Sequence, residues 1–239
     1  MSCSLIKRIL LTGSQDVNII LTNQRMVYTF LNPVSYLDAV KEKEMFNNFD
    51  GLFADGAILT SAISLLYGEI VPRRSFDMTS IAPLLFEFAE RKGKSIYIVA
   101  SEQAQVEKAV EIFRERYPAI RIIGYRNGYF KSEDEQYNEA RHISALNPDF
   151  VIVGMGILMQ EKFLLKIKDA GFQGIGFTCG GFIHQTAKDQ IDYYPKWIDK
   201  YNLRFLYRMY NEPHTRMRYI KAGFVFPWRF LYERFFGKE

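Results

Sequence analysis

Cysteine is scarce in this sequence of 239 residues, which argues against a disulfide-rich or zinc-stabilised protein. Cys3 and Cys179 are far apart and have no histidines at metal-ligand spacing. A reducing compartment is therefore expected. No run of about 20 apolar residues occurs, so no membrane span is predicted. The opening MSCSLIKRILLTGSQD has too short an apolar core for a signal peptide or an anchor.

Glycine is missing from the first predicted strand-to-helix turn, where enzymes that bind nicotinamide or a methyl donor need it. Residues 17–21 are predicted as the first strand, and this strand runs into LTNQRM, which has no glycine. The absence weighs against both classes of enzyme. A hydrophobic content of 48% is enough for a substantial core, in one large domain or in one domain with an appendage.

Positive charge is concentrated at one end of the chain. Residues 203–239 contain eight Lys or Arg and three acidic residues, a balance of +5, which leaves −1 for residues 1–202 within the net charge of +4. The same tail holds eleven aromatic residues, including Trp228. This change in composition predicts a domain boundary, with a core at 1–202 and a basic, aromatic appendage at 203–239.

Strand and helix patterns alternate through the core. Each short apolar run is followed by a segment with helical spacing, and glycines stand at several strand ends. This order predicts a Rossmann-like α/β fold, with a mostly parallel sheet, helices on both faces and a helical C-terminal appendage. Strands are predicted at 17–21, 52–53, 95–100, 120–124, 150–153 and 174–178, and helices up to Tyr28, after Pro33, and at 57–66, 78–91, 103–117, 133–146 and 160–170.

One stretch, PDFVIVGMGILMQEK at 148–162, is the centre of this pattern. Its apolar strand ends at Gly154 and Gly156, and Gln160 and Glu161 open the following helix. Two closely spaced glycines allow a sharp turn and close approach of a ligand, and free N–H groups at a helix start suit a phosphate or diphosphate. An ordinary turn without a ligand is the alternative, because the full dinucleotide motif is absent.

Other candidate residues also follow predicted strands or precede helices. Because ligands in such folds lie beyond the carboxyl ends of the strands, each is a candidate for substrate binding. Each also has a structural alternative: the Asp, Asn and Thr residues are common helix caps, glycines make turns, and a single histidine is more often a core or surface residue. The candidates are Thr22, Asn23, Asp55, Asp77, Thr79, Gly180, Gly181 and His184.

Four motifs occur together in this order: ADG at 54–56, IRIIGYRNGYF at 120–130, NPDFVIVGMGILMQEKF at 147–163 and LYRMYNEPHTRMRY at 206–219. In combination they resemble the bacterial WecG/TagA/CpsF glycosyltransferases, which make surface polysaccharides and wall teichoic acids. The likeness covers residues 18–219. It implies inverting transfer of a sugar, often N-acetylmannosamine or its uronic acid, from a UDP-sugar to a sugar carried on undecaprenyl diphosphate.

The resemblance assigns roles to residues of the core. Asp55 matches the family aspartate and would act as general base on the acceptor hydroxyl, since a carboxylate is ionised at neutral pH. Gln160 matches a family glutamine that positions donor or acceptor oxygens, and Glu161 follows it. Asn23 matches a family asparagine. The threonine that relatives have two residues earlier aligns with Leu21, so either Thr22 takes its place or the contact is absent. Beside these matches, substrate contacts are predicted for Asp77, Thr79, Tyr129, Gly154, Gly156, Gly180 and Gly181.

Arginines of the tail match the family as well. Arg208 and Arg218 are expected to stabilise the charge on the departing UDP through paired hydrogen bonds, and Arg216 to contribute less. Acidic pairs of the DxD type are not evident, so neither a metal nor a cofactor is expected, and the arginines would take the place of a metal. The sequence departs from the family at 157–159, where relatives have a Ser-Pro-Lys run, at Thr215 in place of an arginine, and at Arg204 in place of a glutamate.

The implied acceptor carries a lipid, so the tail is predicted to dock on the inner face of the cytoplasmic membrane. VFPWRFLYERFF at 225–236 interleaves aromatic and basic residues suited to lipid headgroups, with Pro227 predicted to break any single long helix. The alternative is that these aromatics pack on the core or at a subunit interface, and assembly into a homo-oligomer is left open. Nucleic acid is not an expected partner, but a nucleic-acid-binding module and a catalytically silent membrane scaffold remain rival interpretations.

Overall fold

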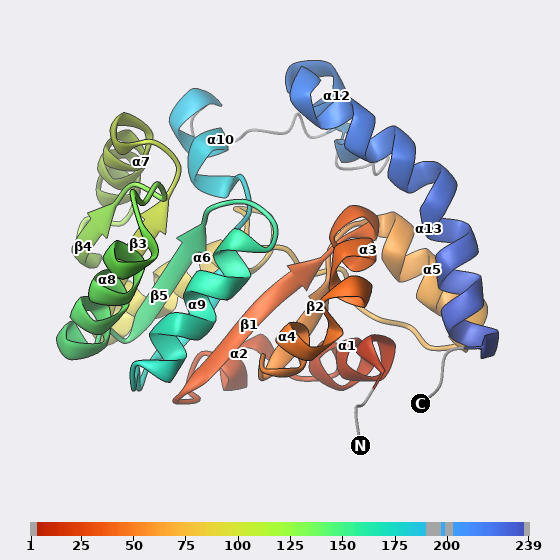
Figure 1. Ribbon diagram of the computed structural model, residues 1–239. Coiled ribbons are helices and arrows are strands. Elements are labelled where there is room, and N and C mark those ends of the chain that lie inside the picture. Colours follow the sequence, from red (N-terminus) through yellow and green to blue (C-terminus); the bar gives the residue numbers. More distant parts are fainter. Residues whose placement is uncertain (1–3, 190–196, 199–202, 237–239) are drawn as a thin grey trace.

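The computed structural model describes residues 4–189, 197–198 and 203–236, so Cys3 lies outside the described residues. Within them, six strands form one sheet in the order β2-β1-β6-β5-β3-β4, and every pairing is parallel. Figure 1 shows this sheet at the centre of the molecule, with helices around it. The strands are β1 Met26–Leu31, β2 Gly51–Ala54, β3 Ser95–Ala100, β4 Arg121–Arg126, β5 Phe150–Gly154 and β6 Ile175–Thr178.

Helices cover both faces of the sheet. Successive residues of a strand point to opposite faces, and each face packs into its own hydrophobic cluster. Phe150 and Ile152 of β5 belong to one cluster, and Val151 and Val153 to the other. Strands buried on both sides read as continuous apolar runs. Helices α2 Val17–Ile20, α6 Ile81–Lys92, α7 Gln103–Arg116 and α10 Phe182–Asp189 pack on the first face; α1 Leu5–Gly13, α3 Pro33–Lys41, α4 Lys43–Asn47, α5 Ala57–Tyr67, α8 Glu133–Leu146 and α9 Met159–Asp169 pack on the second.

The predicted α/β fold with a parallel sheet is confirmed, but the start of the chain differs from the prediction. Residues 17–20 form α2, whose N-cap Asp16 accepts a hydrogen bond from the Asn18 N–H. The first strand is β1, whose first half lies in the segment predicted to be helical up to Tyr28. Helix α1 was not predicted either. A short apolar run does not distinguish a buried strand from a helical turn. Here the N-cap aspartate favours the helix.

The tail forms α12 Arg204–Asn211, the 3-10 helix Pro213–Thr215, and the long helix α13 Arg216–Phe236. The expectation that Pro227 would break a long helix is wrong, because α13 runs through it. Packing holds the helix on both sides of the proline: Phe226 and Phe230 are buried, and both pack against Tyr36 of α3. In Figure 1, α13 lies along the side of the molecule next to α3 and α5.

Part of the tail therefore packs on the core, as the alternative interpretation held. Other aromatic side chains of α13, among them Trp228, Phe235 and Phe236, are exposed. Across the residues that the structure describes, no helix has both the length and the apolar character needed to cross a bilayer. The boundary between residues 202 and 203 stays a prediction.

Candidate active site

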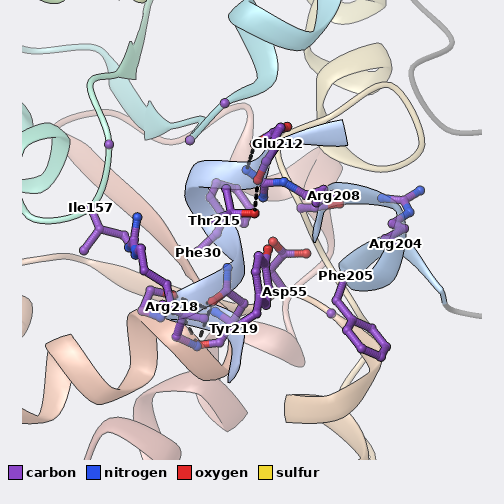
Figure 2. A pocket seen from close by; sticks show the side chains of 18 of the residues that line it. Phe30, Asp55, Ile157, Arg204, Phe205, Arg208, Glu212, Thr215, Arg218 and Tyr219 are labelled. Atoms are coloured by element: carbon purple, nitrogen blue, oxygen red, sulfur yellow. Dashed lines mark hydrogen bonds and ion pairs between the residues drawn. The ribbon is translucent and has the colours of Figure 1, made fainter. Parts of the chain in front are cut away.

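A cavity of about 1040 Å³ lies at the carboxyl ends of the strands and is closed on one side by the tail. Asp55 follows β2, the glycine turns follow β5 and β6, and Arg208 and Arg218 come from α12 and α13. Parallel strands bring their carboxyl ends to one edge, so residues far apart in the sequence meet there. Figure 2 shows side chains of this pocket, with Asp55 among residues of the tail.

Asp55 does not cap the helix that follows it. Its N–H donates to the Leu31 carbonyl at 2.8 Å, which fixes it at the end of β2, and the N-cap of α5 is Gly56, with φ of +88°. Burial, followed by the negative charge of Asp77, raises the pKa of Asp55 to about 6, against the opposing effect of Arg73, Arg208 and Arg204. A carboxylate with this pKa is largely ionised at neutral pH and holds a proton more readily than an exposed aspartate, as a general base requires.

Asp77 lines the cavity, but its carboxylate is bound by protein groups. Arg204 of α12 donates to it at 2.8 Å, and the backbone N–H and the hydroxyl of Thr79 donate at 2.8 and 2.6 Å. Burial alone would raise the pKa of Asp77, but Arg204 and the hydrogen bonds of Thr79 outweigh burial and lower it. Asp77 therefore stays charged, joins the tail to the loop before α6, and acts on Asp55 electrostatically.

The two glycine turns lie against each other. A Cβ added at Gly154 would lie 2.6 Å from the Cys179 Sγ and 2.9 Å from the Gly180 carbonyl oxygen, so only glycine fits there. Gly156 and Gly180 have φ of +83° and +55°, a region that favours glycine. The turns thus form a continuous wall of backbone that a ligand can approach closely.

Gln160 connects these two turns from the first turn of α9. Its side-chain carbonyl accepts the Gly180 N–H at 3.1 Å, and its amide nitrogen donates to Glu161 at 2.8 Å. Glu161 is buried beneath the cavity and does not line it. Its other partners are the Leu158 N–H at 2.7 Å and the Thr29 hydroxyl at 2.9 Å. Burial raises the pKa of Glu161, and these hydrogen bonds oppose the rise.

Arg208 reaches from the tail to the glycine turn after β6. Its guanidinium lies 3.3 Å from the buried carboxylate of Glu212, which also accepts a hydrogen bond from Gln185 of α10 at 3.3 Å. A Cβ added at Gly181 would lie 3.5 Å from a guanidinium nitrogen of Arg208. Figure 2 shows Arg208 and Glu212 on the same side of the pocket, joined by a dashed line. Glu212 therefore holds a positive charge beside the backbone wall.

The match to known proteins is consistent with this geometry. Residues 12–239 match the family described as glycosyl transferase WecG/TagA/CpsF. The chain belongs to this family. It is 34% identical, over 226 residues that cover 94% of each chain, to UDP-Gal:alpha-D-GlcNAc-diphosphoundecaprenol beta-1,4-galactosyltransferase of Shigella boydii. It is also 24% identical, over 191 residues that cover 78% of this chain and 72% of the relative, to N-acetylglucosaminyldiphosphoundecaprenol N-acetyl-beta-D-mannosaminyltransferase of Bacillus subtilis strain 168.

Most of the predicted site residues of this glycosyltransferase lie on the cavity wall. They are Asp55, Asp77, Tyr129, Gly154, Gly156, Gln160, Gly180, Gly181, Arg208 and Arg218. Thr79 and Glu161 do not line the cavity, but each binds a residue that does: exposed Thr79 binds Asp77, and buried Glu161 binds Gln160. Arg216 is not part of the wall: it donates to the carbonyls of Met209 and Tyr210 and so fixes the turn between α12 and α13.

Thr22 and Asn23 are not brought to the cavity, and they do not end the first strand as predicted. They follow α2 and precede β1, at the amino end of the strands; the Thr22 hydroxyl donates to the Ile19 carbonyl and the Asn23 amide to the Tyr28 hydroxyl. The residue that follows β1 on the cavity wall is Asn32, whose side chain also caps α3. The apolar run MVYTFL followed by Asn-Pro is the sequence signal that could have identified Asn32.

His184 and Arg73 are two further wall residues. His184 lies in the first half of α10, after the glycine turn, and was interpreted from the sequence as a core or surface residue. Arg73 donates to the hydroxyls of Ser75 and Thr79 and lowers the pKa of Asp55. Within the described parts of the chain, no group of three or more His, Cys, Asp or Glu side chains is placed to hold a metal.

Proposed function

We propose that this glycosyltransferase moves a hexose from a UDP-sugar to a sugar carried on undecaprenyl diphosphate, with inversion at the anomeric carbon. The observation that carries the proposal is the position of Asp55, a carboxyl with a pKa of about 6, in one cavity with Arg208 and Arg218. The names of both relatives specify a GlcNAc-diphosphoundecaprenol acceptor and a β-linked product. The two relatives transfer different sugars, so galactose and N-acetylmannosamine are both candidates for the sugar that this protein transfers.

In this proposal Asp55 removes the proton from the acceptor hydroxyl as the oxygen attacks the anomeric carbon. The bond from that carbon to the UDP oxygen breaks on the opposite face, and UDP leaves with the electron pair. Asp55 is suited to the base role because its pKa lies below neutral pH but well above that of an exposed aspartate. Attack on one face and departure from the other accounts for inversion.

The leaving diphosphate is stabilised by two arginines that line the cavity, and Arg208 is already held in place before reaction. Arg208 is held by Glu212 against Gly181, and Arg218 lines the cavity from the first turn of α13. Guanidinium groups bind diphosphate through paired hydrogen bonds, and fixed donors stabilise developing charge without reorganising. The glycine turns at Gly154, Gly156 and Gly180 supply backbone that the nucleotide diphosphate approaches closely.

We further propose that the protein works as a peripheral protein on the inner face of the cytoplasmic membrane. The acceptor is anchored in a bilayer, and the exposed aromatic side chains Trp228, Tyr232, Phe235 and Phe236 of α13 suit the headgroup boundary. Arg234 contributes less than the sequence suggests, because it donates to the Leu66 carbonyl and stacks on Tyr67. The surface would thus bind mainly through its aromatic side chains.

The test is transfer by purified full-length protein. UDP-sugars, including UDP-galactose and UDP-N-acetylmannosamine, are incubated with GlcNAc-diphosphoundecaprenol, and the product is identified by mass spectrometry and its linkage by NMR. We expect one β-linked disaccharide product and one equivalent of UDP. An α-linked product would contradict inversion, and absence of UDP release from every donor would contradict the proposal as a whole.

A further inference from the structure

The cavity is lined by two chemically different groups of side chains. Asp55, Gln160 and the arginines form one group, and apolar side chains of α5, α12 and α13 form the other, which we call the outer end because several of them are exposed. Four of these line the cavity and are at the same time exposed: Ile58 at 48%, Leu206 at 48%, Ile220 at 45% and Phe224 at 76%. A sugar nucleotide offers no apolar chain to this end.

Helix α13 explains why these side chains are not part of the core. Ala222, Phe226 and Phe230 form the face that packs on the protein, and all three are buried. Ile220 and Phe224 belong to another face and line the cavity while staying exposed, whereas Ala222 and Phe226 line it from the buried face. Apolar side chains gathered in an exposed, concave surface indicate a binding site, because each Å² removed from water contributes about 25 cal/mol.

We propose that this outer end binds the isoprenoid segment next to the diphosphate of the acceptor. The inference rests on the proposed function and assigns a place to the lipid part of its substrate. Arg218 and Phe224 lie on the same helix, six residues apart, which corresponds to about 9 Å along its axis. The acceptor's sugar has to reach Asp55, so its own diphosphate and first isoprene units extend from there past Ile220 and Phe224, and Ile58 of α5 lines the same cavity.

The occupant is a single chain rather than the bilayer surface. Ile58, Leu206, Ile220 and Phe224 line a cavity, whereas the exposed aromatics of α13 from Trp228 onward do not. A concave apolar channel that begins at a cluster of positive charge fits one apolar chain with an anionic head. A flat membrane surface fits the outer face of the helix instead.

The experiment compares two soluble diphosphates that differ only in their chain. Binding of farnesyl diphosphate and methyl diphosphate to the full-length protein is measured by calorimetry without bilayers. Burying even a few CH₂ groups, at about 0.8 kcal/mol each, predicts that farnesyl diphosphate binds at least tenfold more tightly. Phe224→Ser and Ile58→Ser should each reduce this preference to threefold or less while leaving the affinity for methyl diphosphate within twofold.

Met217→Ser is the matched control, because Met217 lies on the same helix, is 73% exposed and does not line the cavity. This variant should keep the full preference. The inference is refuted if wild type binds the two diphosphates equally or binds neither, if Phe224→Ser weakens both to the same extent, or if Met217→Ser behaves like Phe224→Ser. A protein that prefers the farnesyl chain but transfers no sugar would instead contradict the proposed function.

Discussion

Asp77 and Arg204 form an ion pair of 2.8 Å that joins the loop before α6 to the first turn of α12. Both residues line the cavity that contains Asp55, and they act on it in opposite directions: Asp77 raises the pKa of Asp55 and Arg204 lowers it. The contact that holds the tail to the core therefore also sets the charge around the proposed base.

This relationship predicts opposite shifts of the pH profile. A base with a pKa of about 6 loses activity as pH falls through 6. Asp77→Asn removes a negative charge near Asp55, lowers the pKa of Asp55 and should move the acid limb of kcat/KM to lower pH. Arg204→Ala removes a positive charge and should move the limb to higher pH. Shifts in the same direction would show that neither residue acts through Asp55.

Asp55→Asn tests the base directly. Transfer should fall by roughly a hundredfold or more, as removal of a general base typically causes, while UDP binding is kept because the side chain changes little in size. Turnover and calorimetric UDP binding are measured on the same preparation. Loss of UDP binding in proportion to turnover would indicate a binding role instead.

The stability of the same variant has a predicted pH dependence. The folded-state pKa of Asp55 is raised from 3.8 to about 6, so the folded protein binds this proton more tightly than the unfolded chain does. The stabilisation from protonation is full below about pH 4 and is lost as pH rises through 6. Asp55→Asn should therefore exceed wild type in Tm at pH 7.5, and the difference should shrink as pH falls from 6 to 4. A constant difference across this range would contradict the raised pKa.

Substitution of the tail arginines should have different effects, depending on whether the arginine lines the cavity. Arg208→Ala and Arg218→Ala should each lower kcat, and lysine should restore activity only in part, because an ammonium cannot offer a planar pair of donors. Arg216→Ala is the matched control, since Arg216 binds backbone carbonyls outside the cavity. It should lower Tm more than it lowers kcat per folded molecule. Full rescue by lysine at both cavity positions would argue against bidentate contact.

Glu161 should act through Gln160 and the turn before α9 rather than on substrate. Glu161→Ala leaves the Leu158 N–H and the Gln160 amide without their buried acceptor, and each such group costs about 1–3 kcal/mol. Chemical denaturation should show a lower free energy of unfolding, with a lower kcat for the folded fraction. Lys162→Ala, at the exposed neighbouring position, should change neither quantity. Unchanged stability in Glu161→Ala would contradict this role.

How far the sequence predicts the structure depends on the kind of signal. The strand at 95–100 and the helix at 133–146 were predicted with the observed bounds, because period and capping agree there. Residues 17–21 were misassigned because their apolar run fits either structure, and this error moved the predicted site from Asn32 to Thr22 and Asn23. The different positions of Arg216 and Arg218 depend on how α13 packs, which no local pattern specifies.

The final prediction concerns the membrane. Truncation after Lys221 is a poor test, because it would remove Phe226 and Phe230, which pack on Tyr36 of the core. The triple change Trp228→Ser, Phe235→Ser and Phe236→Ser removes exposed side chains only and should leave Tm almost unchanged.

If these aromatics insert at the headgroup boundary, the triple variant should bind liposomes containing anionic lipid at least tenfold more weakly than wild type, because each large apolar side chain contributes about 1.5–3 kcal/mol on full burial. Turnover of the membrane-embedded acceptor should fall in parallel. Turnover of a short-chain soluble acceptor should not, since the cavity wall is intact. Arg229→Ala serves as a charge control: Arg229 pairs with Glu233, so its loss should affect binding less than the aromatic change does. Equal liposome binding by wild type and the triple variant, at low and at physiological salt, would remove the membrane role from this part of α13.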